Sequence, residues 1–556
     1  MAVQTSQHQL KEVEDYLVGL RSENLQPTII LSVGNFTERG QVSEFYGDTY
    51  EAAWKSFLSH YSKNRLDSAS YFRIDIVTEE EPIAYSQLNE RISSIKRNNY
   101  GDFNFRWEQA GQYSFLMEEL VGNALLKPSK DHRVGYNLPE LTINEQNFRG
   151  YMKRKYKRSN AQTKELERAA IFLFKTKAFY FEEGNVYPLT DYGNGNRVRE
   201  VTASNLDKIT DSVIEKGSEY LEKQLMSTGQ FIYGYYPCYD QRIKGYNSVR
   251  HFSSLYALAE AAEYKSDQAL CEKIEQGIHW GITHLTSTVD RYTLVMEPLS
   301  KTVEYKLGAQ ATAILAIAKY TEVTGDSQFH SFLQKLIVSV KEKFITAQNR
   351  TIHVLDEALG IKEAFRIVYY DGEILFALLR AYGIFKEARI MHICEDLMAA
   401  FIANDYQKYH DHWLSYATNE LLRFKEKKEY YQFGLDNALG NLRFIDRRDT
   451  AYPTMLELLV AASKMMDKLA ESDMKHTLFQ EEKEVIDIKD RINGVMVKRV
   501  RHELTTGVMF PEFAQFFKEP ATINYGFFAR HDRFRMRIDD AEHFLSGLIN
   551  YRLHTN

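Results

Sequence analysis

The chain contains 556 residues, of which 44% are hydrophobic and 26% charged, and its formal net charge is −6. The length exceeds the roughly 250–300 residues at which a single hydrophobic core stops growing, so the sequence predicts two domains. A slightly acidic chain offers no electrostatic footprint for a phosphate backbone, which argues against nucleic acid as a partner.

The cysteines and the apolar segments indicate in which cellular compartment the protein is found. Cys238, Cys271 and Cys394 are widely spaced and form no CxxC pair, so neither a disulfide framework nor a zinc knuckle is expected. The opening sequence MAVQTSQHQLKEVEDYL lacks the apolar region of a signal peptide, and no run approaches the ~18 apolar residues of a membrane span. We therefore expect a cytoplasmic protein with no membrane span.

Residues 1–200 mix strand-like and helix-like segments. TIILSV (28–33) and YFRIDIV (71–77) alternate and are rich in β-branched residues, whereas TYEAAWKSFLSHY (49–61) has the spacing of an amphipathic helix. The turn-rich stretch 191–205 ends this region. The sequence predicts an N-terminal α+β domain over 1–200, which carries no functional motif and is available to recruit a protein partner.

Residues 201–556 consist of a succession of amphipathic helices in which a polar cluster repeatedly precedes a helix rich in small apolar residues. Six such segments begin at Asn247, Glu304, Tyr369, His410, Tyr452 and Met536. Their spacing, very roughly 40–85 residues, leaves room for one helix pair each. Small residues allow the inner helices to pack closely, and a closed ring would gather their polar N-terminal ends at one mouth.

This arrangement resembles the six-hairpin (α/α) toroid superfamily, which includes many glycosidases, polysaccharide lyases and N-acylglucosamine 2-epimerases. The resemblance covers about residues 203–556 and rests on the style of the segments, so no family's catalytic residues are transferred. It implies a mainly α protein, with an (α/α) toroid of about six helical hairpins over 201–556. Lanthionine cyclases and protein prenyltransferases have a similar architecture, but their Cys/His zinc ligands are not found here at suitable spacing.

The polar clusters at the helix starts supply the candidate site. In YYDGE, Asp371 and Glu373 are candidate catalytic acids or bases, and Tyr370 beside them is a candidate substrate contact. The alternative is that Asp371 caps the helix and Glu373 compensates its dipole.

In RIDDAEH, Asp540 and His543 lie three residues apart and would share one helix face, the arrangement in which a carboxylate orients an imidazole. Both are candidate catalytic residues. The alternative is an ion-paired capping segment in which Arg537 neutralises the acids. Arg537 is also a candidate substrate contact, together with Arg530 in the preceding arginine-rich run, which suits an anionic ligand.

A third cluster combines His410, His412, Trp413 and, further along, Glu420. The two histidines stand at i and i+2 and diverge on a helix, so no metal site is expected. Trp413 offers an apolar face to a sugar ring, and the polar side chains offer directional hydrogen bonds. The alternative is a helix start with a buried tryptophan.

A fourth cluster is dense in tyrosine and leads into a helix that starts with an Arg-His pair. Tyr236 and Tyr239 are candidate pocket residues, because cores favour Leu and Val over so many hydroxyl groups. Arg250 can grip a carboxylate or phosphate in a bidentate fork, and His251 follows it. GNGNR (193–197) lacks the context of a phosphate-binding loop, so no cofactor is expected.

These features favour a carbohydrate-active enzyme that uses acid/base catalysis on an intracellular saccharide, including an anionic one, or on a cell-envelope precursor. Hydrolysis would need two carboxyls, whereas epimerisation or elimination would need a base near a carbon acid. The alternatives are a non-catalytic binding or assembly protein that uses the toroid groove, and a metal-dependent peptide-modifying enzyme. The enzyme hypothesis predicts that eight residues line one cavity: Arg250, His251, Asp371, Glu373, His410, His412, Asp540 and His543.

Overall fold

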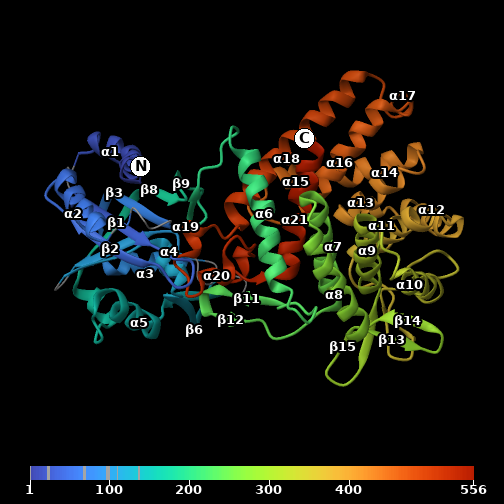
Figure 1. Cartoon of the computed structure of the whole chain (residues 1–556), viewed down its shortest axis with the longest axis horizontal. Coiled ribbons are helices and arrows are strands. Elements are labelled where there is room, and N and C mark those ends of the chain that lie inside the picture. Colours follow the sequence, from blue (N-terminus) through green and yellow to red (C-terminus); the bar gives the residue numbers. More distant parts are fainter. Residues whose placement is uncertain are drawn as a thin grey trace. The chain divides into compact units, whose positions relative to one another are not determined.

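The chain forms two compact units (Figure 1). The computed structural model describes residues 2–21, 25–64, 66, 71–95, 101–108, 111–134 and 138–556. The first compact unit, here called the sheet unit, comprises Met1–Ala203, Tyr235–Arg242 and Thr505–Met536. The second, here the toroid unit, comprises Ser204–Gly234, Ile243–Leu504 and Arg537–Asn556. Two later segments thus group with the N-terminal region, whereas the boundary near residue 200, as a limit of independent folding, stays a prediction.

The sheet unit is built on an eight-stranded antiparallel sheet in the order β10-β9-β8-β3-β1-β2, with β4 paired to β8 and β5 paired to β4. Its strands are β1 (Thr28–Val33), β2 (Gln41–Tyr46), β3 (Tyr71–Ile83), β4 (Asn104–Glu108), β5 (Gln112–Phe115), β8 (Ala170–Glu182), β9 (Asn185–Asp191) and β10 (Arg197–Arg199). Its longer helices are α1 (Ala2–Val18), α2 (Tyr50–Lys63), α3 (Tyr85–Ser94) and α5 (Glu145–Tyr156). The predicted α+β region, with both strands and the helix after Thr49, is confirmed.

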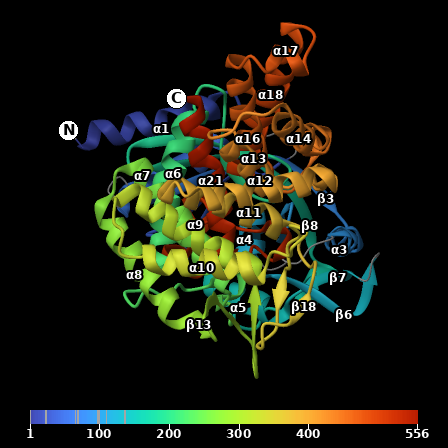
Figure 2. The same ribbon diagram turned by 90° about the vertical axis from the view of Figure 1, so that its right-hand side faces the viewer.

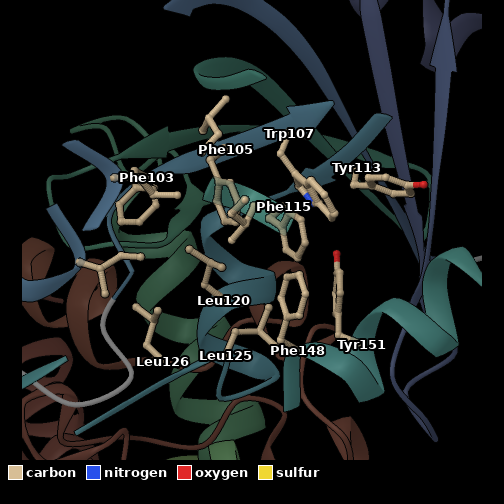
Figure 3. Packing of buried hydrophobic residues seen from close by; sticks show 14 of the residues in the cluster. Phe103, Phe105, Trp107, Tyr113, Phe115, Leu120, Leu125, Leu126, Phe148 and Tyr151 are labelled. Carbon is tan, nitrogen blue, oxygen red and sulfur yellow. The ribbon is translucent and has the colours of Figure 1, made fainter. Parts of the chain in front are cut away.

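Two apolar clusters hold these layers together. One joins α1 and α2 to β1 and β3, and Phe57 lies at its centre with no exposed surface. The other joins α3 and α5 to β4 and β5 through stacked aromatic rings (Figure 3). In it the Phe105 and Phe115 ring centroids lie 4.5 Å apart, and Phe148 stacks on Phe115 at 6.0 Å. Burial of such large rings supplies the main stabilisation of the unit.

A network of buried charges crosses the sheet unit. Arg73 pairs with Asp75 at 2.7 Å and with Glu118 at 3.0 Å, and all three side chains are buried. Arg199 pairs with Glu512 at 2.7 Å, and Glu512 lies in the short helix α19 (Pro511–Ala514). The segment Thr505–Met536, here the C-terminal segment, therefore adds a second counter-charge for Arg199, which also pairs with Glu182 at 2.9 Å.

The toroid unit contains a closed ring of six inner helices, each packed against the next, with the last packed against the first. These are α7 (Ser248–Lys265), α9 (Leu307–Thr324), α11 (Tyr369–Phe385), α13 (His412–Leu421), α16 (Thr454–Glu471) and α21 (Ile538–Thr555). Their starts lie within three residues of the six predicted segment starts. The (α/α) toroid is therefore confirmed, and Figure 2 shows α9, α11 and α13 side by side.

Each inner helix is covered by a partner from an outer layer. The outer helices are α6 (Leu206–Gln224), α8 (Gln268–His284), α10 (His330–Lys343), α12 (Ala388–Ala403), α14 (Lys428–Leu439) and α18 (Glu482–Gly507). The first five pack against inner helices, and α18 contacts α16 through a 2.7 Å hydrogen bond between Ser463 and Asn493. In α9 every residue from Leu307 to Thr321 is buried, because its alanines admit neighbours on all sides.

No helix in the described ranges is both long enough and apolar enough to cross a membrane.

Candidate functional site

The N-terminal ends of three inner helices bring His412, Glu457 and His543 together. His412 is the first residue of α13, Glu457 lies in the first turn of α16, and His543 lies in the second turn of α21. One ligand-type atom from each lies within 4.8 Å of the others, and the two imidazole centroids are 5.3 Å apart. Three segments that are distant in sequence thus meet at one end of the ring.

His412 is held by the cap of its own helix. Asp411 accepts hydrogen bonds from the backbone N–H groups of Trp413 at 3.1 Å and Leu414 at 3.2 Å. The same carboxylate lies 3.2 Å from His412 Nδ1, while His412 Nε2 lies 3.8 Å from Glu457 Oε2. Burial lowers the pKa of His412 to about 3, so the imidazole is neutral.

His543 lies between two carboxylates. Its Nδ1 is 3.0 Å from Glu457 Oε2, and its Nε2 is 3.3 Å from Glu542 Oε2. Burial lowers the pKa of His543, but Glu542 and Glu457 more than offset this and raise it to about 10. The second oxygen of Glu457 accepts from the Tyr416 hydroxyl at 3.4 Å. The two imidazoles therefore differ in charge although they face the same carboxylate.

Glu373 adds a carboxyl group from the second turn of α11. The side chain is buried, and its Oε2 has no hydrogen-bond partner. Burial and the carboxyl of Asp411 raise the pKa of Glu373 to about 8, a further contribution from Asp371 acts in the same direction, and His543 opposes them. Glu373 is therefore mainly a neutral carboxylic acid at pH 7; this form can donate a proton, and the carboxylate form, whose share grows as the pH rises toward 8, can accept one.

The raised pKa of Glu373 makes stability depend on pH. The folded protein holds this proton more tightly than the unfolded chain does, so stability falls as pH rises from about 4.5 to about 8. Glutamine has no proton to lose. We expect Glu373→Gln to be more stable than the parent protein at pH 9, by on the order of 2–4 kcal/mol, and nearly equal to it at pH 4. Denaturant titrations at the two pH values test this, and an equal difference at both would contradict it.

Gly308, the second residue of α9, packs directly against Glu373. A Cβ atom at Gly308 would lie 2.5 Å from Glu373 Oε2 and 2.3 Å from the Tyr370 ring. The Gly308→Ala variant should therefore displace Glu373 and lower turnover by up to about 100-fold, because positioned catalytic groups tolerate little misplacement. Steady-state kinetics would measure the loss. Gly383→Ala is the matched control, because its Cβ would meet nothing within 4 Å and turnover should not change.

Arg250 lies near the start of α7, and its side chain is partly exposed. Its Nε lies 2.9 Å from Asp539, and its Nη1 donates to the Tyr233 hydroxyl. Asp539 also accepts from Arg537 at 2.8 Å. These two arginines, both candidate contacts from the sequence, share one aspartate at the start of α21.

The structure places Asp371, Tyr370 and His251 in other contacts. Asp371 accepts from the Thr351 hydroxyl and lies 3.2 Å from His353 Nε2, and the Tyr370 ring packs on His353. His251 hydrogen-bonds the Gly277 carbonyl at 3.0 Å, toward α8. The side chains of Asp371 and His251 are thus engaged away from the His412–His543 pair.

The remaining toroid candidates have structural partners. Asp540 accepts the Arg537 backbone N–H at 3.0 Å, which is the helix-capping geometry. His410 Nδ1 lies 2.8 Å from the Asn437 carbonyl oxygen. Trp413 is buried against Phe376 and Tyr416, and Glu420 pairs with Arg423 at 2.8 Å in the last turn of α13.

Three candidates belong to the sheet unit. The Tyr236 hydroxyl accepts from Arg533 at 3.0 Å, and Arg530 donates to Asn196 at 2.5 Å. Tyr239 is 41% exposed and also belongs to this unit. The prediction of a single cavity lined by all eight residues named from the sequence stays a prediction. The structure brings His412 and His543 together, with Glu373 electrostatically coupled to His543.

Sequence reasoning missed Glu457, Glu542 and the role of Asp411. Glu457 belongs to the YPTMLELLVAA segment, where one acid in a first helical turn resembles ordinary dipole compensation. The position of Glu457 was a usable signal. It lies near the start of the fifth predicted inner helix, where the other five segments carry their polar clusters.

Comparisons with known proteins concern the fold. No protein-family model and no curated protein matches the sequence. Cellobiose 2-epimerase from Bacillus thermoamylovorans B4167 is similar in structure, with 11% identity, a TM-score of 0.44, and coverage of 62% of this chain and 99% of that chain. A D-mannose isomerase is similar in structure with 10% identity and a TM-score of 0.48, and the match covers 64% of this chain and 100% of that chain. A variant of the alpha-1,6-mannanase GH76A of Salegentibacter sp. HEL1_6 is similar in structure with 10% identity and a TM-score of 0.41, and the match covers 63% of this chain and 99% of that chain.

Proposed function

We propose that this protein is a carbohydrate-active enzyme that moves protons at a carbon atom of a sugar, as an epimerase or isomerase does. The observation that carries the proposal is the arrangement of the His412 and His543 imidazoles around the Glu457 carboxylate, with the neutral carboxyl of Glu373 nearby. All four groups come from the N-terminal ends of inner helices. Neither Glu373 Oε2 nor His412 Nε2 has a hydrogen-bond partner.

The types of residue favour proton transfer at carbon over glycoside hydrolysis. Hydrolysis needs two carboxyl groups on either side of a glycosidic oxygen, one as acid and one as base or nucleophile. Here the groups that face one another are imidazoles. Removing a proton beside a carbonyl requires a base at the carbon and an electrophile at the oxygen, and such a set can supply both.

In this proposal the carboxylate form of Glu373 removes the proton from the sugar carbon, and the carboxylic acid so formed returns a proton to carbon. The imidazoles contact the carbonyl and hydroxyl oxygens, and Glu457 fixes their orientation through the contacts at 3.0 and 3.8 Å. Arg250 supplies hydrogen bonds to further hydroxyls or to an acidic substituent of the sugar. No disulfide bond joins Cys238, Cys271 or Cys394 in the described part of the chain, which fits an intracellular sugar or cell-envelope precursor as substrate.

A substrate panel tests the proposal. The full chain is incubated with neutral reducing sugars, uronic acids and disaccharides, and the products are separated by chromatography. Conversion of one sugar into an equilibrium mixture with its epimer or ketose supports the proposal. Release of monosaccharides from a disaccharide would replace it with hydrolysis, and binding without conversion would replace it with the non-catalytic alternative.

A further inference from the structure

We propose that His412, Glu457 and His543 form a binding site for one divalent transition-metal ion of the Zn2+ type. No metal site was predicted from the sequence, because the two histidines considered there, His410 and His412, stand at i and i+2 and diverge on a helix. The set proposed here takes one side chain from each of three inner helices. The metal site goes beyond the proposed function. Only the use of the metal in catalysis rests on that function.

The spacing of the three side chains fits such an ion. Zn2+ binds nitrogen and oxygen ligands at about 2.0–2.2 Å, which places neighbouring ligand atoms roughly 3–4 Å apart. Glu457 Oε2 lies 3.0 Å from His543 Nδ1 and 3.8 Å from His412 Nε2. All three ligand atoms lie within 4.8 Å of one another, so small side-chain rotations would close the set around one ion.

His412 provides an independent indication. The Asp411 carboxylate accepts two backbone N–H groups and lies 3.2 Å from His412 Nδ1, which favours the tautomer with its proton on that nitrogen. His412 Nε2 is then a lone pair aimed at the carboxylate oxygen of Glu457. The side chain is only 3% exposed, and this nitrogen has no hydrogen-bond partner. This nitrogen faces Glu457 Oε2, which also lies 3.0 Å from His543 Nδ1. An ion that replaces the proton on His543 Nδ1, with that proton released to solvent, would bind all three atoms.

Each proposed ligand also has an orienting partner. Asp411 orients His412, Glu542 lies 3.3 Å from His543 Nε2, and Tyr416 donates to the outer oxygen of Glu457 at 3.4 Å. Carboxylates that hold the second nitrogen of a ligating histidine are a regular feature of protein metal sites, since they fix the tautomer and strengthen the ligand. The buried carboxylates of Glu457 and Glu542 would offset the charge of the ion.

Three protein ligands leave at least one coordination position open, the pattern of catalytic rather than structural sites. The chemistry that an ion supplies there is polarisation of a bound oxygen. For the proposed sugar reaction, that oxygen would be the carbonyl or a neighbouring hydroxyl. With an ion bound, the two imidazoles would hold the ion in place of contacting the sugar oxygens directly, and Glu373 would keep its role in proton transfer.

Metal binding can be measured without any substrate. The full chain is treated with a chelator, dialysed, and titrated with Zn2+ by calorimetry and with Co2+ by visible absorption. We expect one ion per chain and the absorption of low-coordinate Co2+. Glu457→Gln should weaken binding at least about 100-fold, and Glu542→Gln about 10–100-fold, as expected for an outer partner. Glu260→Gln, a buried glutamate of α7 bonded to Ser546, is the control and should bind as the parent does.

Absence of stoichiometric binding would overturn the metal site, and so would equal binding by Glu457→Gln and the parent. Circular dichroism verifies folding, and His543→Gln replaces Glu457→Gln if the latter is unfolded. Sugar conversion by a chain that binds no metal would refute the ion but leave the proposed function intact. Metal binding without conversion of any sugar would support the site and refute the proposed function.

Discussion

Replacing Glu373 with glutamine is expected to reduce turnover by about 10²–10⁴-fold, the usual weight of a positioned proton-transfer group. Glutamine keeps the size and shape of the side chain, but it cannot exchange a proton. Because Glu373 Oε2 has no hydrogen-bond partner, the substitution breaks no contact of that oxygen. The measurement is kcat on the sugar that the substrate panel identifies, with thermal unfolding at the same pH as the check on folding.

Asp540→Asn serves as the comparison for this prediction. The sequence suggested Asp540 as a catalytic acid, but its carboxylate accepts the Arg537 backbone N–H, and asparagine can accept the same bond. We expect Asp540→Asn to retain turnover within a few-fold of the parent. Equal losses in both variants, or full activity of Glu373→Gln, would remove Glu373 from the proposed chemistry.

The Glu512→Ala variant is expected to lose about 1.5–3 kcal/mol of stability, because it removes buried charge-assisted hydrogen bonds of Arg199 and leaves Glu182, at 2.9 Å, as the remaining counter-charge. Glu512 accepts from the Arg199 backbone N–H at 2.9 Å and pairs with the guanidinium at 2.7 Å. Neither side chain is more than 5% exposed. Urea denaturation followed by tryptophan fluorescence measures the loss, since Trp54 and Trp107 lie in the sheet unit.

A surface ion pair in the same sheet provides the control. Glu79 and Lys175 lie 2.7 Å apart, but their side chains are 65% and 73% exposed. Water and salt screen such a pair, so Glu79→Ala should change stability by less than about 1 kcal/mol. A loss below about 1 kcal/mol for Glu512→Ala as well would show that the C-terminal segment does not stabilise the sheet unit.

The sequence predicted the ring because its signals are local. Alanine-rich segments such as 309–318 can be buried on all sides, and polar residues before them mark helix starts, so six inner helices followed from six segments. The C-terminal contribution to the sheet unit was not predictable in this way. Arg199 and Glu512 are separated by 313 positions, and neither neighbourhood indicates the other.

The site was predictable only in part for a similar reason. His412, His543 and Glu373 stood out because unusual residues cluster around them. Glu457 did not, since a single acid in a leucine-rich helix looks like any first-turn carboxylate. Asp371 and Asp540 looked like equal candidates, and only their contacts with His353 and with the Arg537 backbone separate them from Glu373.

The measurement that tests the account most directly is solvent deuterium incorporation, followed by proton NMR in D2O with a sugar that the enzyme binds. The account predicts that the proton on the carbon beside the carbonyl is replaced by deuterium at the rate of product formation, and that Glu373→Gln slows both together. Product formation that shows neither deuterium at that carbon nor a slower rate with substrate deuterated at that carbon, or exchange unaffected by Glu373→Gln, would contradict proton transfer at this site.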